Sequence, residues 1–85
     1  MAWVYILQGS RRHYIGATEN LNRRITEHRR GSNHTTRRLG EELLVAAATE
    51  VSSMAEARTL ERQLKRKKNP RLAIAALNLK NMLNR

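Results

Sequence analysis

Apolar and polar positions alternate near the start of the chain, and this pattern predicts a β-hairpin. Residues 3–8 are rich in β-prone side chains and place Tyr5 and Leu7 on one face of a strand. Residues 9–12 contain glycine and serine and are typical of a hairpin connection, after which residues 13–17 return as a second strand.

The second strand contains a glycine that has a positional meaning. Tyr14 and Gly16 are two residues apart, so they share one face of the strand. A glycine inside a strand allows another group to approach the backbone closely. We therefore expect Gly16 to be a point of close approach.

Helical spacing follows the hairpin. Residues 19–30 are predicted to form a helix, with Thr18 or Asn20 as N-cap and Gly31 at its end. The apolar arc of this helix is expected to contain Leu21, Ile25 and His28. Arg24 lies at the edge of the arc, one turn before His28, so the two side chains are neighbours on one side of the helix.

The middle of the chain is less definite. Residues 31–42 are polar and partly basic, which indicates a loop. Residues 43–51 form a short apolar run that favours a strand because of its length, although its alanines suit a helix equally well.

A capping box predicts the start of another helix. Ser53 and Glu56 have the spacing of an N-cap and its reciprocal partner. The apolar arc of this helix would contain Met54, Ala57, Leu60 and Leu64. Glu61 projects on the same inward side, where a carboxylate is costly unless it has a partner, a metal or a chemical role. The basic residues 65–68 close the helix, where they complement its dipole.

The last helix is predicted over residues 70–83, because Asn69 and Pro70 resemble an N-cap followed by proline at the first helical position. Its buried stripe is expected to contain Leu72, Ala76, Leu79 and Leu83. An exposed apolar side with Ile74 and Leu77 would then be available for self-association.

Composition narrows the class of partner. The chain has 85 residues, which indicates one domain over residues 1–85, and its formal net charge is +10. Such a charge favours a polyanionic partner, because phosphate backbones release condensed counterions when lysine and arginine bind them. The alternative is a basic protein that is merely soluble or that belongs to a ribonucleoprotein.

Two missing residue types add to this picture. The chain has no cysteine, which excludes disulfides and thiolate metal sites. No apolar run is long enough to cross a membrane. A cytoplasmic location is therefore the simple expectation. The chain also has no aspartate, and its seven acids are all glutamates. A nuclease site with two metal ions needs several converging carboxylates. Any phosphodiester chemistry is therefore expected to use one metal ion or none.

The order of polar residues resembles that of the GIY-YIG nuclease family, particularly its small stand-alone members related to the N-terminal domain of the excinuclease C subunit. Tyr14-Ile15-Gly16 matches the second half of the family name, and Trp3-Val4-Tyr5 stands where Gly-Ile-Tyr would be. The catalytic arginine of the family, ten residues after the second tyrosine, corresponds to Arg24, and a frequent histidine corresponds to His28. The metal-binding glutamate, followed by leucine and lysine, corresponds to Glu61. The resemblance covers about residues 2–68.

The resemblance implies an α+β fold with a central three-stranded antiparallel sheet flanked by helices in the order β-β-α-β-α-α. It makes residues 43–51 the third strand, and the helix over residues 70–83 becomes an extension of the nuclease domain. An asparagine that many larger members place after the glutamate-bearing helix has two candidates, Asn69 and Asn78, and neither matches cleanly.

The resemblance also implies roles for the site residues. Tyr5 and Tyr14 together would activate the water, helped by a positive field that favours the phenolate. Arg24 would hold the phosphate and stabilise its developing charge. Glu61 would bind one Mg²⁺ or Mn²⁺ ion, and His28 would position a tyrosine or the phosphate, or move a proton.

Further basic residues are candidates for contacts with the nucleic-acid backbone, and they are Arg37, Arg38, Arg62, Lys65, Arg66, Lys67 and Lys68. The alternative is that these charges only keep the protein soluble. His13 and His34 are interpreted as surface residues that could contact phosphate.

Three functions remain open from the sequence. The first is a metal-dependent DNA endonuclease that acts on branched or damaged DNA in repair or recombination, with a protein partner that supplies selectivity. The second is a non-catalytic nucleic-acid-binding module that retains the fold. The third is a ribosome-associated or RNA-binding basic protein.

Overall fold

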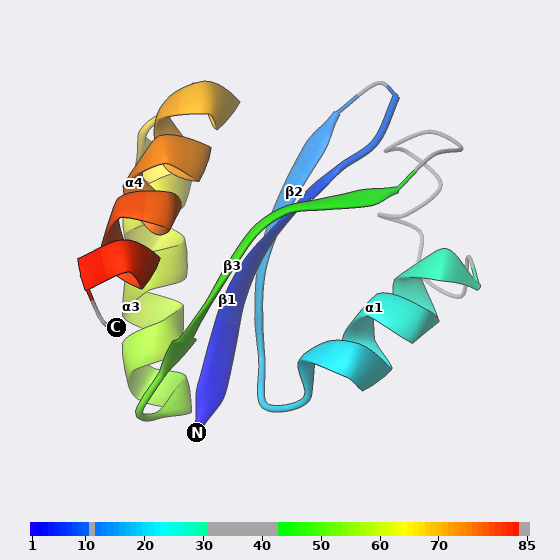
Figure 1. Ribbon diagram of the computed structural model, residues 1–85, viewed down its shortest axis with the longest axis horizontal. Helices are drawn as coiled ribbons and strands as arrows, with labels where there is room; N and C mark the ends of the chain where they lie inside the picture. The colour runs from blue at the N-terminus through cyan, green and yellow to red at the C-terminus, as the bar shows by residue number, and fades with distance from the viewer. Residues whose placement is uncertain (11, 31–42, 84–85) are drawn as a thin grey trace.

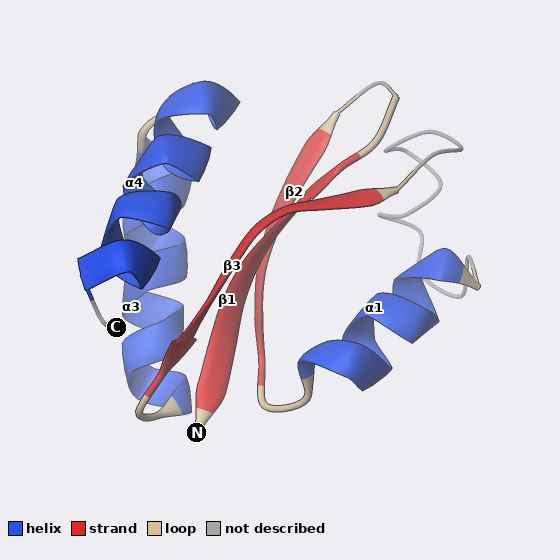
Figure 2. Cartoon of the chain, viewed as in Figure 1, coloured by secondary structure: helices blue, strands red, loops and turns tan. Residues whose placement is uncertain are grey.

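The computed structural model describes residues 1–10, 12–30 and 43–83, and these residues form a layered α+β fold. The elements follow the predicted order: β1 (Ala2–Gln8), β2 (His13–Thr18), α1 (Leu21–Arg29), β3 (Leu44–Val51), α3 (Met54–Arg66) and α4 (Pro70–Leu83). Helices α3 and α4 lie on one side of the sheet and α1 lies on the other (Figures 1 and 2). The predicted fold class is confirmed.

The three strands pair in the order β2-β1-β3, and both pairings are antiparallel. In the hairpin, Tyr5 lies opposite Gly16 and Leu7 lies opposite Tyr14. On the other side of β1, Ala2 lies opposite Val51, with an irregularity in the register between Ile6 and Leu7. The ambiguous run is therefore a strand, and its alanines allow the helices to pack close to the sheet.

The larger core lies between the sheet and the helices α3 and α4. Its buried members among the described residues are Ala2, Val4, Ile6, Ala47, Val51, Ala57, Leu64, Ala73 and Leu77. Met54 and Leu60 pack against this core as partly buried side chains, so the predicted apolar arc of α3 is confirmed. At its start, the Ser53 side chain accepts a hydrogen bond from the Glu56 backbone N–H at 3.2 Å, as the capping box predicts.

A smaller apolar cluster lies on the opposite face of the sheet, beside α1. Tyr5 and Leu7 are its fully buried members among the described residues. Asn20 is the N-cap of α1, and its side chain accepts from the backbone N–H of Arg23 at 3.1 Å. The helix begins at Leu21, so Glu19 precedes it instead of lying in its first turn. Gly31, expected at its end, lies outside the described residues.

The predicted buried face of α4 is wrong except at Ala76, which packs against the larger core as a partly buried residue. Leu72, Leu79 and Leu83 are 57%, 54% and 74% exposed, whereas Leu77 is fully buried and Ile74 packs against the larger core. The reason is that α4 has apolar residues on most of its surface, so its spacing does not select one face. Its rotation is set by tertiary contacts, including the small Ala73 at the sheet and a 3.4 Å hydrogen bond from Thr49 Oγ1 to Asn81 Oδ1.

Within the described ranges, no helix has both the length and the apolar character that crossing a bilayer would require.

Candidate active site

Two tyrosine rings meet over Gly16 on the α1 side of the sheet. The ring centroids of Tyr5 and Tyr14 are 6.1 Å apart. A Cβ atom added to Gly16 would lie 2.6 Å from the Tyr5 hydroxyl oxygen and 2.8 Å from Cε1 of Tyr14. Such distances are far inside normal contact, so only glycine leaves room for both rings at this position. The predicted close approach at Gly16 is therefore present, and the groups that approach it are the two tyrosines.

Helix α1 brings a histidine to the same place. His28 is buried, and its Nε2 atom lies 3.0 Å from the hydroxyl oxygen of Tyr5. Its ring centroid is 5.1 Å from that of Tyr14 and 5.9 Å from that of Tyr5. The three rings thus form one contiguous group built from β1, β2 and α1.

Arg24 adds a positive charge to this group from the preceding turn of α1. Its guanidinium donates to Glu27 Oε2 at 3.1 Å, and it also interacts with the hydroxyls of Tyr5 and Tyr14. These partners raise the pKa of Arg24, with the hydrogen bond to Tyr5 as the main cause. The Arg24 side chain remains 38% exposed, so its charge is held beside the phenols and is still reachable from solvent.

At Tyr5, burial opposes the phenolate that the positive field was expected to favour. Burial of its ring raises the pKa of Tyr5 to about 12, and the neighbouring Arg24 only partly opposes this rise. In a desolvated site, the free-energy cost of ionising a phenol is larger than the stabilisation that one positive neighbour provides. Tyr5 is therefore a neutral hydrogen-bonding group at physiological pH.

His28 is held in its neutral form. Burial lowers its pKa, and the positive charge of Arg24 lowers it further. A neutral imidazole has one nitrogen that accepts a hydrogen bond. Because the Tyr5 phenol is protonated, the simplest arrangement is donation from the Tyr5 hydroxyl to His28 Nε2 across the 3.0 Å contact.

Glu61 lies on α3, on the other side of the sheet from α1. Its side chain is 19% exposed, which confirms the predicted inward position, and it pairs with Lys65 at 3.2 Å. Among the described residues, no hydrogen bond or ion pair joins Glu61 to Tyr5, Tyr14 or Arg24. Tyr5, Tyr14, Arg24 and His28 are therefore in mutual contact. Among the described residues, Glu61 is connected to this group through the surface between α3 and β2.

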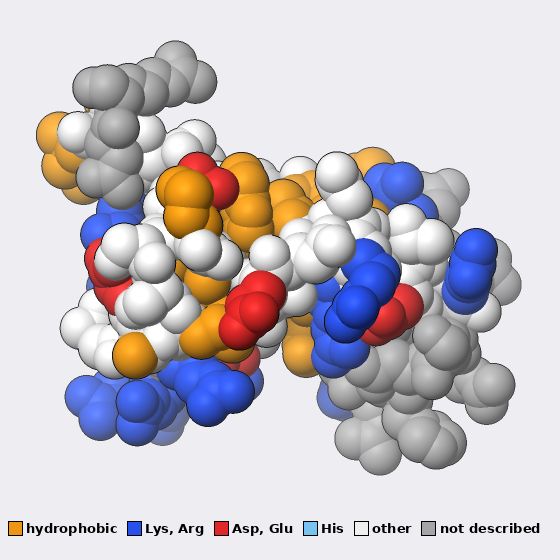
Figure 3. All heavy atoms as spheres, turned by 90° about the horizontal axis from the view of Figure 1, so that it is seen from below, with side chains coloured by type: hydrophobic (Ala, Val, Ile, Leu, Met, Phe, Trp, Pro, Cys, Tyr) orange, Lys and Arg blue, Asp and Glu red, His pale blue; other side chains and the backbone are white. Residues whose placement is uncertain are grey.

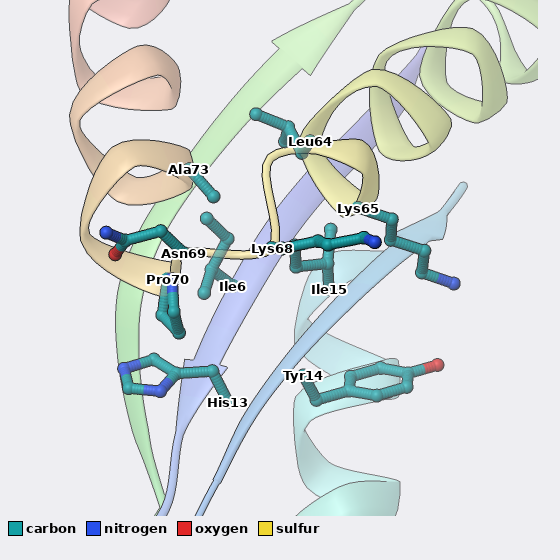
Figure 4. A pocket seen from close by; sticks show the side chains of 10 residues that line it. All are labelled: Ile6, His13, Tyr14, Ile15, Leu64, Lys65, Lys68, Asn69, Pro70 and Ala73. Carbon is teal, nitrogen blue, oxygen red and sulfur yellow. The ribbon is translucent and has the colours of Figure 1, made fainter.

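That surface is a pocket of about 310 Å³ between the hairpin and the turn that joins α3 to α4. Tyr14 and Lys65 both line it, so it connects the tyrosine group with the ion pair of Glu61. In the close view, the hydroxyl of Tyr14 and the ammonium groups of Lys65 and Lys68 point to the same side (Figure 4).

The side chains of the site can be compared with the ligands that the metal ion implied by the resemblance would need. No group of three or more acidic or histidine ligands occurs among the described residues. Mg²⁺ commonly uses one or two carboxylates and completes its shell with water and substrate phosphate. Glu61 fits this minimal role because it is a hard oxygen ligand that, within the described part of the chain, pairs with the half-exposed Lys65. The residues present therefore fit one weakly held ion.

The model of the GIY-YIG catalytic domain matches residues 1–73 of the chain. The protein belongs to the GIY-YIG family. Comparison with curated proteins and with solved structures gives no match.

The GIY-YIG match indicates a nuclease-type fold, and it ends inside α4. The convergent residues described above all lie within the matched range, as does Glu61. Most of α4 lies beyond the match.

Basic side chains of this GIY-YIG domain gather in two areas of the surface. Seen from below, lysines and arginines lie over the α3 side and over the α1 side of the molecule (Figure 3). The predicted backbone-contacting residues on and after α3 are all exposed, and they are Arg62, Lys65, Arg66, Lys67 and Lys68. Arg37, Arg38 and His34 lie outside the described residues.

The two asparagine candidates of the GIY-YIG pattern have different surroundings. Asn69 is the N-cap of α4, where its Oδ1 accepts from the backbone N–H of Arg71 at 3.0 Å, and it lines the pocket. Asn78 is exposed on α4. Asn69 is thus near the site but already engaged in capping.

Sequence reasoning missed two features of this site. His13, interpreted as a surface residue, begins β2 and lines the pocket. Lys68 has a positive φ of 54°, a conformation that non-glycine residues rarely adopt. The position of His13 follows from the register of the hairpin, whereas no signal in the sequence predicts the backbone of Lys68.

Proposed function

We propose that this GIY-YIG protein is a divalent-metal-dependent endonuclease that hydrolyses DNA phosphodiester bonds. The observation that carries the proposal is the convergence of Tyr5, Tyr14, Arg24 and His28 on one face of the hairpin. A guanidinium beside two phenols at a partly open surface suits a phosphate, because it can bind the anion and supply groups that move a proton.

The two tyrosines have different roles in this proposal. Tyr5 is buried, has a raised pKa and is hydrogen-bonded to His28, so it acts as an orienting group. Tyr14 lines the pocket and its hydroxyl points outward, so it is the group that meets the attacking water and, as the phenolate, accepts its proton to become the neutral phenol. Its ring lies beside those of Tyr5 and His28, which also contact each other.

Arg24 binds the scissile phosphate. Its charge is fixed beside the phenols by α1 and is oriented by Glu27 at 3.1 Å. A cation held in advance stabilises the charge that grows on the phosphoryl oxygens in the transition state, without a cost of reorganisation.

Glu61 would hold one Mg²⁺ or Mn²⁺ ion at the edge of the pocket. When bound, the metal supplies charge neutralisation for the phosphate and the leaving oxygen. Lys65 neutralises Glu61 in the metal-free protein, and its ammonium group is then released to contact the DNA backbone.

The substrate is proposed to be branched or damaged DNA in repair or recombination, with selectivity supplied by a protein partner. The basic surfaces on α1 and α3 support binding to a polyanion but contain no sequence-reading arrangement that we recognise among the described residues.

One observation favours a second function, a nucleic-acid-binding module without turnover. Glu61 is already paired with Lys65, and among the described residues it belongs to no group of three or more acidic or histidine side chains that could hold a metal ion. A domain that binds phosphate through Arg24 without holding a metal would bind DNA or RNA and leave it intact.

Cleavage assays separate these functions. Purified protein is incubated with branched, nicked, single-stranded and duplex DNA, and with RNA, in Mg²⁺, Mn²⁺ or EDTA. The endonuclease proposal requires cuts in DNA that depend on the metal. Binding that is strong at low salt, with intact DNA in every metal condition, would support the binding module instead.

A further inference from the structure

The pocket beside Tyr14 has a composition that the phosphate chemistry does not use. Its floor is apolar and is formed by Ile6, Ile15, Leu64 and Ala73. Its volume of about 310 Å³ exceeds what a phosphate needs, and an apolar floor is unfavourable for an anion. The occupant should therefore be a flat group with apolar faces.

The mouth of the pocket is basic. Lys65 and Lys68 both line it and extend toward the side of the Tyr14 hydroxyl (Figure 4). The backbone of Lys68 is left-handed, with φ of 54°. Such a conformation is unfavourable for a residue with a Cβ atom and is found where the surrounding chain fixes it, often at functional sites. Two cations are thus held between an apolar hollow and the catalytic tyrosine.

We propose that this pocket receives one unstacked nucleobase of a DNA strand whose phosphates lie on Lys65 and Lys68. The inference rests on the proposed nuclease function and names its substrate class: DNA with an unpaired nucleotide beside the cleaved bond. A paired base would have to leave its stack and its partner to enter, which costs several hydrogen bonds and contacts, whereas an unpaired base enters at little cost.

The pocket recognises the flat faces of the base and not the hydrogen-bonding groups on its edges. The Asn69 amide points away from the hollow and is engaged in capping α4, whereas the imidazole of His13 lies at the rim, where a base can stack on it (Figure 4). Stacking tolerates all four bases because each has a π-face. The protein therefore distinguishes an unpaired nucleotide from a paired one, with little preference for sequence.

The test compares DNA that has a base at the first unpaired position with DNA that lacks this base. Flap DNA is prepared with a thymidine or an abasic analogue as the first unpaired nucleotide, for both flap polarities, and affinities are measured by fluorescence anisotropy in EDTA. We expect the abasic DNA to bind about 10-fold more weakly at one polarity, as for the loss of one stacked base. Equal affinities at both polarities would overturn the inference.

Two variants localise the effect. Ile15→Phe fills the pocket from a partly buried strand position, and this variant should bind the two DNAs equally. Leu72→Phe makes a similar change on the exposed side of α4, and this control should retain the 10-fold difference. If circular dichroism shows that Ile15→Phe is unfolded, His13→Ala takes its place and should reduce the difference. A difference unchanged in the folded pocket variant would also overturn the inference.

Cleavage is measured separately in Mn²⁺ with the same DNAs. Absence of cleavage in every DNA would contradict the nuclease proposal and leave the binding result to decide the pocket. Cleavage with equal affinities for both DNAs would uphold the nuclease and reject the pocket.

Discussion

Tyr5 of β1 and His28 of α1 are joined by a 3.0 Å contact between the phenol oxygen and Nε2, and this contact links the helix to the sheet. Burial and Arg24 lower the pKa of His28, so the unfolded chain takes up protons at a higher pH than the folded protein. The stabilising effect of neutral His28 is complete above the unfolded pKa of about 6.5 and is lost as the pH falls through the folded value.

We therefore expect the thermal midpoint of the protein to fall between pH 7 and pH 5, and His28→Gln to reduce that fall by a few degrees. Glutamine keeps a hydrogen-bonding group and cannot take up the proton. Melting curves by circular dichroism at several pH values would measure the effect. Parallel slopes in wild type and His28→Gln would contradict this account.

Removing single hydroxyls should separate the two tyrosines. Tyr14→Phe is expected to lower the rate of metal-dependent cleavage by about 100-fold or more, the effect of losing a general base. Tyr5→Phe should lower it by only about 10-fold, since burial raises the pKa of Tyr5 and its hydroxyl acts through the contact with His28. Single-turnover rates on one DNA measure both effects. The reverse order would assign the base role to Tyr5.

Arg24→Ala should lower cleavage by about 10³-fold, because a pre-positioned cation is lost from the phosphate site. The adjacent Arg23 provides a matched control: its side chain is 77% exposed, and it also pairs with Glu27. Arg23→Ala removes the same charge from the same helix and should retain activity within about 3-fold at moderate salt. Equal losses in the two variants would show that only the net charge of α1 matters.

Glu61→Gln keeps the size of the side chain and removes its charge. We expect loss of cleavage by about 100-fold and loss of the stabilisation that Mn²⁺ gives to the folded protein, measured as the shift in thermal midpoint with added metal. Glu50 lies at an exposed position of β3, and Glu50→Gln is the control for the lost charge. A metal-induced shift that persists in Glu61→Gln would place the ion elsewhere.

Gly16→Ala should destabilise the protein by about 1–3 kcal/mol, because the new methyl group overlaps Tyr5 and Tyr14. Replacing the Tyr5 hydroxyl alone does not remove the clash, since its Cζ atom lies 2.7 Å from the added Cβ. Tyr5→Leu should therefore offset much of the penalty in a double variant, whereas Tyr5→Phe should not. Urea denaturation of the wild type, the three single variants and the two double variants gives the two double-mutant cycles that test this.

Local signals in the sequence predicted most of the fold. Alternation predicted the hairpin, and the capping residues Asn20 and Ser53 begin α1 and α3 as expected. The face of α4 was not predictable, because Leu72 and Leu77 are equally apolar and only packing on the sheet decides which is buried. The length of residues 43–51 favoured the third strand, and the family resemblance decided it, since alanines also suit a helix.

For the site, the family resemblance implied which side chains belong together, and the structure brings Tyr5, Tyr14, Arg24 and His28 into contact but not Glu61. The ionisation of Tyr5 was not predictable, because it depends on how deeply the ring is buried and not on the net charge of the chain. The engagement of Glu61 by Lys65 also depends on the rotamers that α3 adopts in the folded protein.

The unequal packing of the two sheet faces has a practical consequence. The side that α3 and α4 cover contains most of the buried apolar residues, whereas the side beside α1 relies on Tyr5 and Leu7 among the described residues. Warming should therefore loosen α1 while the hairpin and the other helices still hold together. Heat inactivation would then precede melting, and a preparation that looks intact by its overall helix content could already have lost its chemistry.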